Sequence, residues 1–492
     1  MKLSLISPRL ALQKGDFLGS GVPYWPLELA TLAAFARERG DDIGFIDLFG
    51  NNTRQLEDVG DHYLQGQPIT MHLASPALAD SEAFILYAIS YMSHNELLTI
   101  TRTLKSAFPR IPVAILENSQ AVTAYSLQRM ARSFLEAGAT ALICGEAYFN
   151  WDAIKQAIVD PQACAPNVIK TIDAPAPARQ MQPDFHYPIP AWDLVNLQGY
   201  WNLPYSHGPK TPTFLPMLTS RGCPYACDFC VVPETNDKRW RGNSPEDVVN
   251  EMLALRDRYN VRDFQIEDLN PTVRHERWER ICELLVERNA GIRFYFVSGI
   301  KAETLHIDKI PLFAHAGCRY ISISPESGSR RLMKIIGKKF NYEHGIDLVK
   351  ACARQGIRTQ ACFLVGHPDE NEADFRASRD YLRAMVRAGL DEVAVFVVAP
   401  FAGSQLYARN AIDLQNDAAL PSFSPKGRAN YEHLEQHRKK LIATFFIEKL
   451  KKGFALWLQG LRALFGTPQT KMENLPRRIL FIRRLIRQQS LV

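Results

Sequence analysis

The sequence has no run of 18 or more apolar residues, so we do not expect a membrane-spanning helix. Its beginning, MKLSLISPRL, lacks the apolar stretch and the small-residue cleavage site of a signal peptide. Internal repeats and low-complexity tracts are also missing. Together with 46% hydrophobic and 22% charged residues, these absences indicate a cytoplasmic globular protein. A length of 492 residues suits two or three domains.

A disulfide framework is equally unsupported, because the nine cysteines are odd in number and three of them lie close together. Cys223, Cys227 and Cys230 have the spacing C-x3-C-x2-C, which predicts a metal site. Three thiol ligands for a four-iron cluster leave one iron open to substrate. Structural zinc needs a fourth ligand, and no His or Cys follows at a typical spacing. A zinc site completed from elsewhere, or three unrelated thiols, remain alternatives at this point.

The other cysteines stand alone along the chain. Single, separated thiols are typical of buried core or strand positions rather than of a second metal site. We expect such positions for Cys144, Cys164, Cys282, Cys318, Cys352 and Cys362.

Residues 1–160 alternate short apolar runs with amphipathic stretches, which predicts an α/β domain with a parallel, doubly wound sheet. Such a sheet binds ligands at the carboxyl ends of its strands. The expected strands are 2–7, 43–48, 84–90, 111–117 and 140–145, and the expected helices are 27–40, 95–108 and 124–138.

Residues 161–212 are rich in proline and are expected to form an irregular linker. Residues 213–405 return to alternation and predict a partial (β/α)6 barrel, whose reactive centre would lie at the carboxyl ends of its strands. Ser244 and Pro245 mark the start of its first helix. The six expected strands are 214–220, 263–269, 292–299, 320–326, 358–366 and 392–400.

Residues 406–492 lose the alternation and predict a basic, helical C-terminal region. Residues 438–492 carry 13 Lys and Arg against two acids, so this segment has a charge of +11 and the rest of the chain −5. We expect an amphipathic helix at 445–465 that docks on the barrel or a partner, with a membrane surface as the less favoured alternative. Its apolar stripe comprises Phe446, Leu450, Phe454, Trp457, Leu461 and Leu464.

The cysteine spacing, with Phe229 before the last thiol, resembles the signature of the radical S-adenosylmethionine (SAM) superfamily. Five further segments resemble that family's motifs in the same order: IEDLNPT (266–272), VSGIKAETL (297–305), SISPESGSRRLMKIIGK (322–338), LVGHPDE (364–370) and PFAGSQLY (400–407). The resemblance implies a 4Fe-4S cluster on the three cysteines. It also implies reductive cleavage of SAM to a 5′-deoxyadenosyl radical, with an electron donor such as flavodoxin or ferredoxin. The residues it assigns to SAM are Glu267, Asp268, Ser298 and Glu326.

The N-terminal region resembles the cobalamin-binding domain that precedes the radical core in one class of this superfamily. The likeness rests on residues 23–48, 88–93 and 144–154, and it implies cobalamin contacts from Ser90, Asn118 and Gly145. No D-x-H-x-x-G motif occurs, so cobalamin would bind base-off without a His ligand. One segment departs from the class.

The departure is LENSQAVT (116–123), where relatives usually have paired glycines that let the backbone approach the corrin tail. Glu117 and Asn118 carry side chains there. A retained fold without the cofactor is therefore an alternative.

The predicted activity is methylation of an unactivated carbon or phosphorus of a small molecule, with cobalamin as methyl carrier. A cyclisation, rearrangement or other group transfer, with an auxiliary or empty cobalamin-type domain, is the alternative. A degenerate binding or scaffold protein is a third hypothesis, against which the complete cysteine triplet argues. We expect a small-molecule substrate and no nucleic-acid partner.

Overall fold

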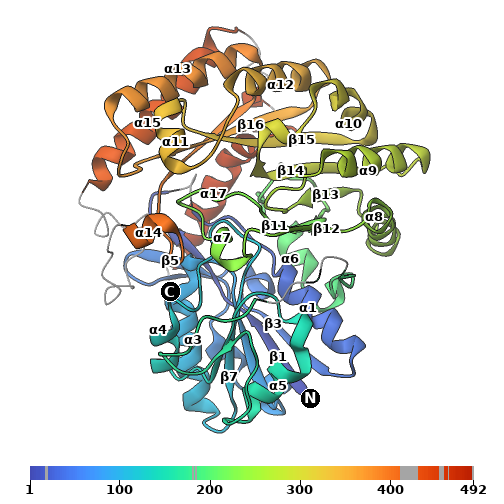
Figure 1. The fold of residues 1–492 in the computed structure, drawn as a ribbon, viewed down its shortest axis with the longest axis vertical. Coiled ribbons are helices and arrows are strands. Elements are labelled where there is room, and N and C mark those ends of the chain that lie inside the picture. Colours follow the sequence, from blue (N-terminus) through green and yellow to red (C-terminus); the bar gives the residue numbers. More distant parts are fainter. Residues whose placement is uncertain are drawn as a thin grey trace.

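The computed structural model of the protein describes residues 1–16, 20–179, 182, 185–409, 430–453, 459–461, 463 and 465–489. Two α/β units are stacked in Figure 1, with the N-terminal sheet in the lower half and the barrel sheet in the upper half. The predicted α/β class, with an N-terminal parallel sheet, a six-stranded parallel barrel sheet and C-terminal helices, is confirmed. The exact domain boundaries stay predictions.

The N-terminal sheet has six strands in the order β3-β1-β6-β7-β8-β9. All neighbours are parallel except β8 and β9. Alternate side chains of β1 enter two different cores: Leu5 packs with α1 and α5, and Ile6 packs with α3 and α4. Helices therefore cover both faces, as in a doubly wound sheet. The elements are β1 Lys2–Ser7, α1 Leu27–Glu38, β3 Asp42–Asp47, β6 Ala83–Ala88, α3 His94–Ala107, β7 Val113–Glu117, α4 Ala131–Glu136, β8 Ala141–Ile143, α5 Trp151–Val159 and β9 Val168–Ile169.

The helix expected at 124–138 is wrong in its first half, because only Ala131–Glu136 is helical. The backbone N–H of Ser126 donates to Ala402 O, and that of Leu127 donates to the carboxylate of Glu117. These long-range hydrogen bonds replace the local ones that a helix would need. Cys164 also departs from its expectation, since it lies exposed in the turn after α5.

The second sheet is a partial barrel with six parallel strands in the order β10-β13-β14-β15-β16-β17. The helix α8 begins at Pro245 as expected, and Ser244 Oγ accepts a hydrogen bond from Asp247 N at 3.0 Å. The elements are β10 Leu215–Met217, α8 Pro245–Tyr259, β13 Asp263–Ile266, α9 His275–Glu287, β14 Arg293–Ile300, α10 Ile310–Ala316, β15 Cys318–Glu326, α11 Arg330–Ile336, α12 Tyr342–Arg354, β16 Arg358–Val365, α13 Glu372–Ala388 and β17 Glu392–Val397.

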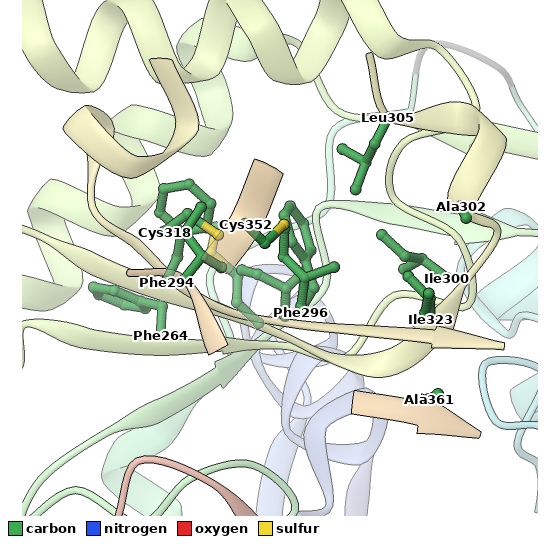
Figure 2. Close-up of a cluster of buried hydrophobic side chains, with 14 of the residues drawn as sticks. Phe264, Phe294, Phe296, Ile300, Ala302, Leu305, Cys318, Ile323, Cys352 and Ala361 are labelled. Atoms are coloured by element: carbon green, nitrogen blue, oxygen red, sulfur yellow. The ribbon is translucent and has the colours of Figure 1, made fainter. Parts of the chain in front are cut away.

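The barrel core lies between its strands and the surrounding helices. Figure 2 shows Phe264, Phe294 and Phe296 pointing into this core beside the thiols of Cys318 and Cys352. All five side chains are 0% exposed. Burial of large aromatic side chains on adjacent strands fixes their register, which in turn fixes the carboxyl ends where the candidate site lies.

The C-terminal region contains α14 (Gln405–Arg409), α15 (Tyr431–Leu450) and α17 (Lys471–Gln489). The single helix expected at 445–465 is wrong, because α15 ends at Leu450 and a turn follows in which Gly453 has a φ of +78°. Leu441 and Phe445, rather than the predicted stripe, pack on the barrel core.

Of the predicted stripe, Phe446, Leu450 and Leu461 are exposed. Phe454, Trp457 and Leu464 lie outside the described residues. Within the described ranges, no helix combines the length and apolarity that crossing a bilayer requires.

A short hairpin joins the two units. Its strands, β11 (Ser220–Gly222) and β12 (Trp240–Gly242), pair in antiparallel fashion directly beside the cysteine segment. Arg221 donates to Glu28 of α1 at 2.7 Å, and Arg241 forms an ion pair with Glu146 after β8. All four residues are at most 8% exposed. The hairpin is therefore bound to the N-terminal domain by buried charges.

Candidate active site

A cavity of about 440 Å³ lies between the N-terminal domain, the barrel and the C-terminal helices. The loop 118–123 after β7 contributes to its wall on the N-terminal side, and α15 and α17 contribute on the C-terminal side. Several residues that the sequence singled out line this cavity: Cys223, Cys227, Cys230, Glu267, Ser298, Glu326 and Asn118.

The three clustered thiols all face this cavity, are half-buried and form no disulfide. Three sulfurs around one zinc ion would lie about 3.8 Å apart, given Zn–S bonds of about 2.3 Å. The three thiols are not all within 4.8 Å of one another. Their spacing is too wide for one ion and suits a larger inorganic core, so the donor set fits the cluster that the resemblance implies.

The cysteine segment is anchored by Asp228, which sequence analysis did not single out. Its backbone N–H donates to Ile336 O at 3.0 Å, and its carboxylate contacts His367 Nε2 at 3.0 Å and the guanidinium of Arg409. Asp228 is 4% exposed. These buried contacts hold the loop in a fixed shape between the thiols.

Lys338 supplies positive charge beside the thiols. Its Nζ donates to Glu326 Oε1 at 2.6 Å and to Ser324 O at 2.7 Å. Burial raises the pKa of Cys227 to about 11, an effect that the ammonium of Lys338 opposes. Glu326 ends β15 with a φ of +59°, a conformation that side chains rarely adopt. The ion pair holds this carboxylate at the cavity wall.

Glu267 follows β13 and pairs with His207, whose Nδ1 lies 2.6 Å from Glu267 Oε2. His207 packs edge-on against Tyr24 of the N-terminal domain, and both line the cavity. Ser298 Oγ lies 3.4 Å from Glu267 O. The structure therefore brings Glu267, Ser298 and Glu326 to the cavity that the three thiols face.

Asp268 is not brought into the cavity. It is 0% exposed and accepts hydrogen bonds from Thr219 N at 2.7 Å, Thr219 Oγ1 at 2.6 Å and Ser220 Oγ at 2.5 Å. These bonds join the end of β13 to the segment that leads into the hairpin. Its contacts are those of a residue that positions the cysteine segment, and binding of SAM by Asp268 stays an untested prediction.

Replacing Asp268 with Ala should therefore destabilise the fold by about 3 kcal/mol, because buried hydroxyl and amide donors lose a charged acceptor. Replacing Glu267 with Ala should leave the unfolding temperature nearly unchanged but weaken SAM binding. Thermal unfolding and anaerobic calorimetry of SAM binding measure the two effects. An unchanged unfolding temperature in the Asp268 variant, with lost SAM binding, would reverse these two assignments.

The N-terminal residues predicted to contact cobalamin lie in different places. Asn118 lines the cavity, and its amide donates to Ile89 O at 2.7 Å. Ser90 instead caps a short turn by accepting from Met92 N at 3.4 Å. Gly145 donates its N–H to Glu117 Oε2 at 2.6 Å. Ser90 and Gly145 do not line the cavity.

The fit of cobalamin is mixed. Tyr87, Ile89 and Asn118 give the cavity a wall at the carboxyl ends of β6 and β7, which would suit a flat ring. Between β7 and β8, however, the buried carboxylate of Glu117 lies 3.3 Å from Arg179 Nε. A Cβ added at Gly145 would lie 3.2 Å from the side chain of the same arginine. This crevice is filled, so the residues present do not fit a corrin tail inserted there.

Sequence reasoning missed the partners of the predicted carboxylates. Lys338 is the last residue of a motif segment, so that motif could have identified it as a site residue. His207 lies in the proline-rich segment and Arg179 in the same linker, where no local pattern marks them. The cavity residues of α17 were also missed, because sequence analysis predicted a basic, helical C-terminal region there but no role in the site.

Comparison with known proteins supports these observations. The model of the family described as "Radical SAM superfamily" matches residues 217–382. A cytidylyl-2-hydroxyethylphosphonate methyltransferase of Streptomyces wedmorensis is 29% identical over 45% of this chain and 42% of its own length. An anaerobic magnesium-protoporphyrin IX monomethyl ester cyclase of Rubrivivax gelatinosus is 26% identical over 42% of this chain and 37% of its own length. The chain spans less than half the length of these two relatives.

Solved structures extend the likeness of fold beyond the barrel. The cobalamin-dependent SAM radical enzyme OxsB, with aqua-cobalamin bound, has a TM-score of 0.63 and 15% identity, over 99% of this chain and 80% of its own. The radical SAM methyltransferase TsrM of Kitasatospora setae has a TM-score of 0.59 and 17% identity, over 80% of this chain and 73% of its own. The matched family model covers the segment that carries Cys223, Cys227 and Cys230, so residues 217–382 form a domain of the radical SAM superfamily.

Proposed function

We propose that this protein is a radical SAM methyltransferase that acts on an unactivated position of a small molecule held in the inter-domain cavity. One observation carries the proposal: the three thiols, Glu267 and Glu326 line the same cavity as the N-terminal loop 118–123. One space then adjoins both the radical-generating residues and the domain of cobalamin-binding type.

The chain's own residues would divide the work of holding SAM. Cys223, Cys227 and Cys230 would ligate the cluster, which supplies one electron to the sulfonium and so yields a 5′-deoxyadenosyl radical. Glu267, held by His207, would accept hydrogen bonds from the amino group of SAM. Abstraction of a hydrogen atom from the substrate forms 5′-deoxyadenosine and leaves the substrate radical. The surrounding protein would keep water from this radical.

An external protein must deliver the electron. We propose a donor such as flavodoxin or ferredoxin, as the resemblance to radical SAM enzymes implies.

Cobalamin, when bound, would supply the methyl group. Of the predicted contacts Ser90, Asn118 and Gly145, Asn118 lines the cavity, whereas Gly145 lies at the crevice that Arg179 fills. The fold shared with OxsB and TsrM and the sequence likeness to a methyltransferase support this choice.

A second candidate is a cyclisation, rearrangement or other group transfer without stoichiometric methyl transfer. The specific observation in its favour is the buried pair of Glu117 and Arg179, which fills the crevice between β7 and β8. The relative described as a cyclase supports the same candidate.

The deciding experiment is anaerobic reconstitution followed by mass spectrometry of SAM products with and without cobalamin. A methyltransferase should consume two SAM molecules per turnover, giving 5′-deoxyadenosine and S-adenosylhomocysteine in comparable amounts. If cobalamin leaves no spectral trace and 5′-deoxyadenosine appears without S-adenosylhomocysteine, methyl transfer is refuted and the second candidate holds.

A further inference from the structure

One face of α17 reaches into the cavity at a place that the SAM residues do not occupy. Lys471, Asn474 and Arg478 line the cavity and follow one another at spacings of three and four, so they share one side of the helix. Lys471 Nζ donates to Val297 O in β14 at 2.8 Å, and Met472 N donates to Glu392 Oε2 in β17 at 2.8 Å. The start of α17 is thus fixed against the barrel strands.

Asn474 carries a buried amide without partners. The side chain is 2% exposed, and neither its amide nitrogen nor its amide oxygen has a hydrogen-bond partner. Most buried polar groups in folded proteins are hydrogen-bonded, because an unsatisfied group loses its hydration without compensation. An unpartnered amide beside a cavity is therefore best explained by a ligand that completes its hydrogen bonds.

The four acidic side chains that line the cavity are each engaged by another side chain of the protein. Each lies within 3.2 Å of a lysine, arginine or histidine side chain, and none of them forms an ion pair with Lys471. The pairs are Asp16 with Arg438, Glu28 with Arg221, Glu267 with His207, and Glu326 with Lys338.

Lys471, like Lys301, is a lysine of the cavity wall that no carboxylate of the described residues pairs with. Its described contacts are the Val297 carbonyl and, at 5.8 Å, the ring of Tyr320, and it forms no ion pair with a carboxylate of the described residues. The nearby carboxylate of Glu392 is already engaged by Met472 N and by Gln360 Nε2, the latter at 2.7 Å. Burial lowers the pKa of Lys471, although the carboxylates of Glu392 and Glu267 oppose this shift. An anion within hydrogen-bond distance would stabilise the ammonium further.

We infer that Lys471 and Asn474 form a subsite for an anionic acid group of the substrate, either a carboxylate or a phosphoryl group. The ammonium would supply a charge-assisted hydrogen bond, and the amide would fix the orientation of the group. Because Lys471 is bonded to Val297, the neighbour of Ser298, the anchored substrate would extend toward the SAM end of the cavity. The inference rests on the proposed function and names the substrate class of the same site.

Anaerobic titration calorimetry on the full-length, cluster-reconstituted protein tests the subsite. SAM is present at saturation, and the probes are inorganic phosphate and acetate. We expect one anion per chain, and an affinity at least about tenfold weaker in Lys471→Gln, which keeps a hydrogen-bond donor but removes the charge. Arg484→Gln changes an exposed arginine of the same helix and should bind the anion as the wild type does.

The preferred probe assigns the acid group: stronger phosphate binding indicates a phosphoryl substrate, and stronger acetate binding a carboxylate. Binding of neither anion, or an equal loss in both variants, overturns the subsite. Formation of 5′-deoxyadenosine under dithionite is measured in parallel without any anion. If it forms although no anion binds, only the subsite fails; if it does not form, the proposed function fails.

A second variant separates binding from folding. Asn474→Leu removes an amide that has no hydrogen bonds to lose, so the unfolding temperature of the anion-free protein should stay the same or rise. Anion affinity should fall in the same variant. A clear drop in unfolding temperature with unchanged anion affinity would show that the amide is structural and would overturn its assignment.

Discussion

Replacing Cys223, Cys227 or Cys230 singly with Ala is expected to abolish formation of 5′-deoxyadenosine. Each thiolate would ligate one iron of the cluster, so the loss of one leaves the cluster incomplete or labile. No other cysteine can replace the lost ligand. The remaining cysteines lie in the barrel core, in the N-terminal domain or, for Cys362, elsewhere on the cavity wall. Iron content and mass spectrometry of SAM products after anaerobic reconstitution measure the effect.

Cys282→Ala is the matched control. Its thiol is 0% exposed within the barrel core, so the variant should lose about 1 kcal/mol of stability and keep its iron and its cleavage activity. Full SAM cleavage under dithionite in any one of the three cluster variants would refute the cluster assignment.

Lys338→Met should be the most destabilising change near the site that spares the cysteines. Lys338 is the ion-pair partner of Glu326, whose side chain is 8% exposed. Removal of one partner leaves a buried charge without compensation, which costs about 3–5 kcal/mol. Urea unfolding of the variant and the wild type, at constant cluster content, measures the difference.

The double variant Lys338→Met, Glu326→Gln should recover most of this loss, because no charge is then buried. pH provides a second check. Burial raises the pKa of Glu326, and a carboxyl with a raised pKa costs stability as the pH rises through that value. The single variant should therefore be less impaired at low pH, where the carboxyl takes up a proton. A single variant as stable as the wild type at neutral pH would show that the pair contributes little.

Much of the fold followed from local patterns. The strands β6 and β7 are nearly continuous apolar runs because parallel strands are buried on both faces, and such runs are readable in one sequence. The cysteine segment was equally readable, since three ligands within one loop must be close in sequence to surround a small cluster.

The helix errors share a physical cause. Residues 124–130 have helical apolar periodicity, yet Leu127 donates its N–H to Glu117, ten positions earlier in the chain. The helix expected at 445–465 breaks because the turn at Gly453 takes a positive φ that periodicity does not report. In both places backbone geometry set by distant or special residues overrides the side-chain pattern.

The site was predictable only in part, for a related reason. Glu267 and Glu326 were found through motifs, but what each carboxylate can do depends on His207 and Lys338, which are 60 and 12 residues away. Asp268 adjoins Glu267 in sequence and faces the opposite way, since successive positions of an extended chain alternate in direction. The proposed anionic subsite lies on α17, and no sequence motif indicates that this helix packs against the barrel.

The buried ion pairs of the β11–β12 hairpin restrict which N-terminal domains can be combined with this barrel. Arg221 and Arg241 belong to the barrel unit, whereas Glu28 and Glu146 belong to the N-terminal domain. A chimera that joins this barrel to the N-terminal domain of a relative would bury two guanidinium groups without a carboxylate partner. This is avoided only if the relative's domain has acidic residues at the positions of Glu28 and Glu146. The two units are therefore not interchangeable modules, and recombination between relatives should succeed only where both charge partners are transferred together.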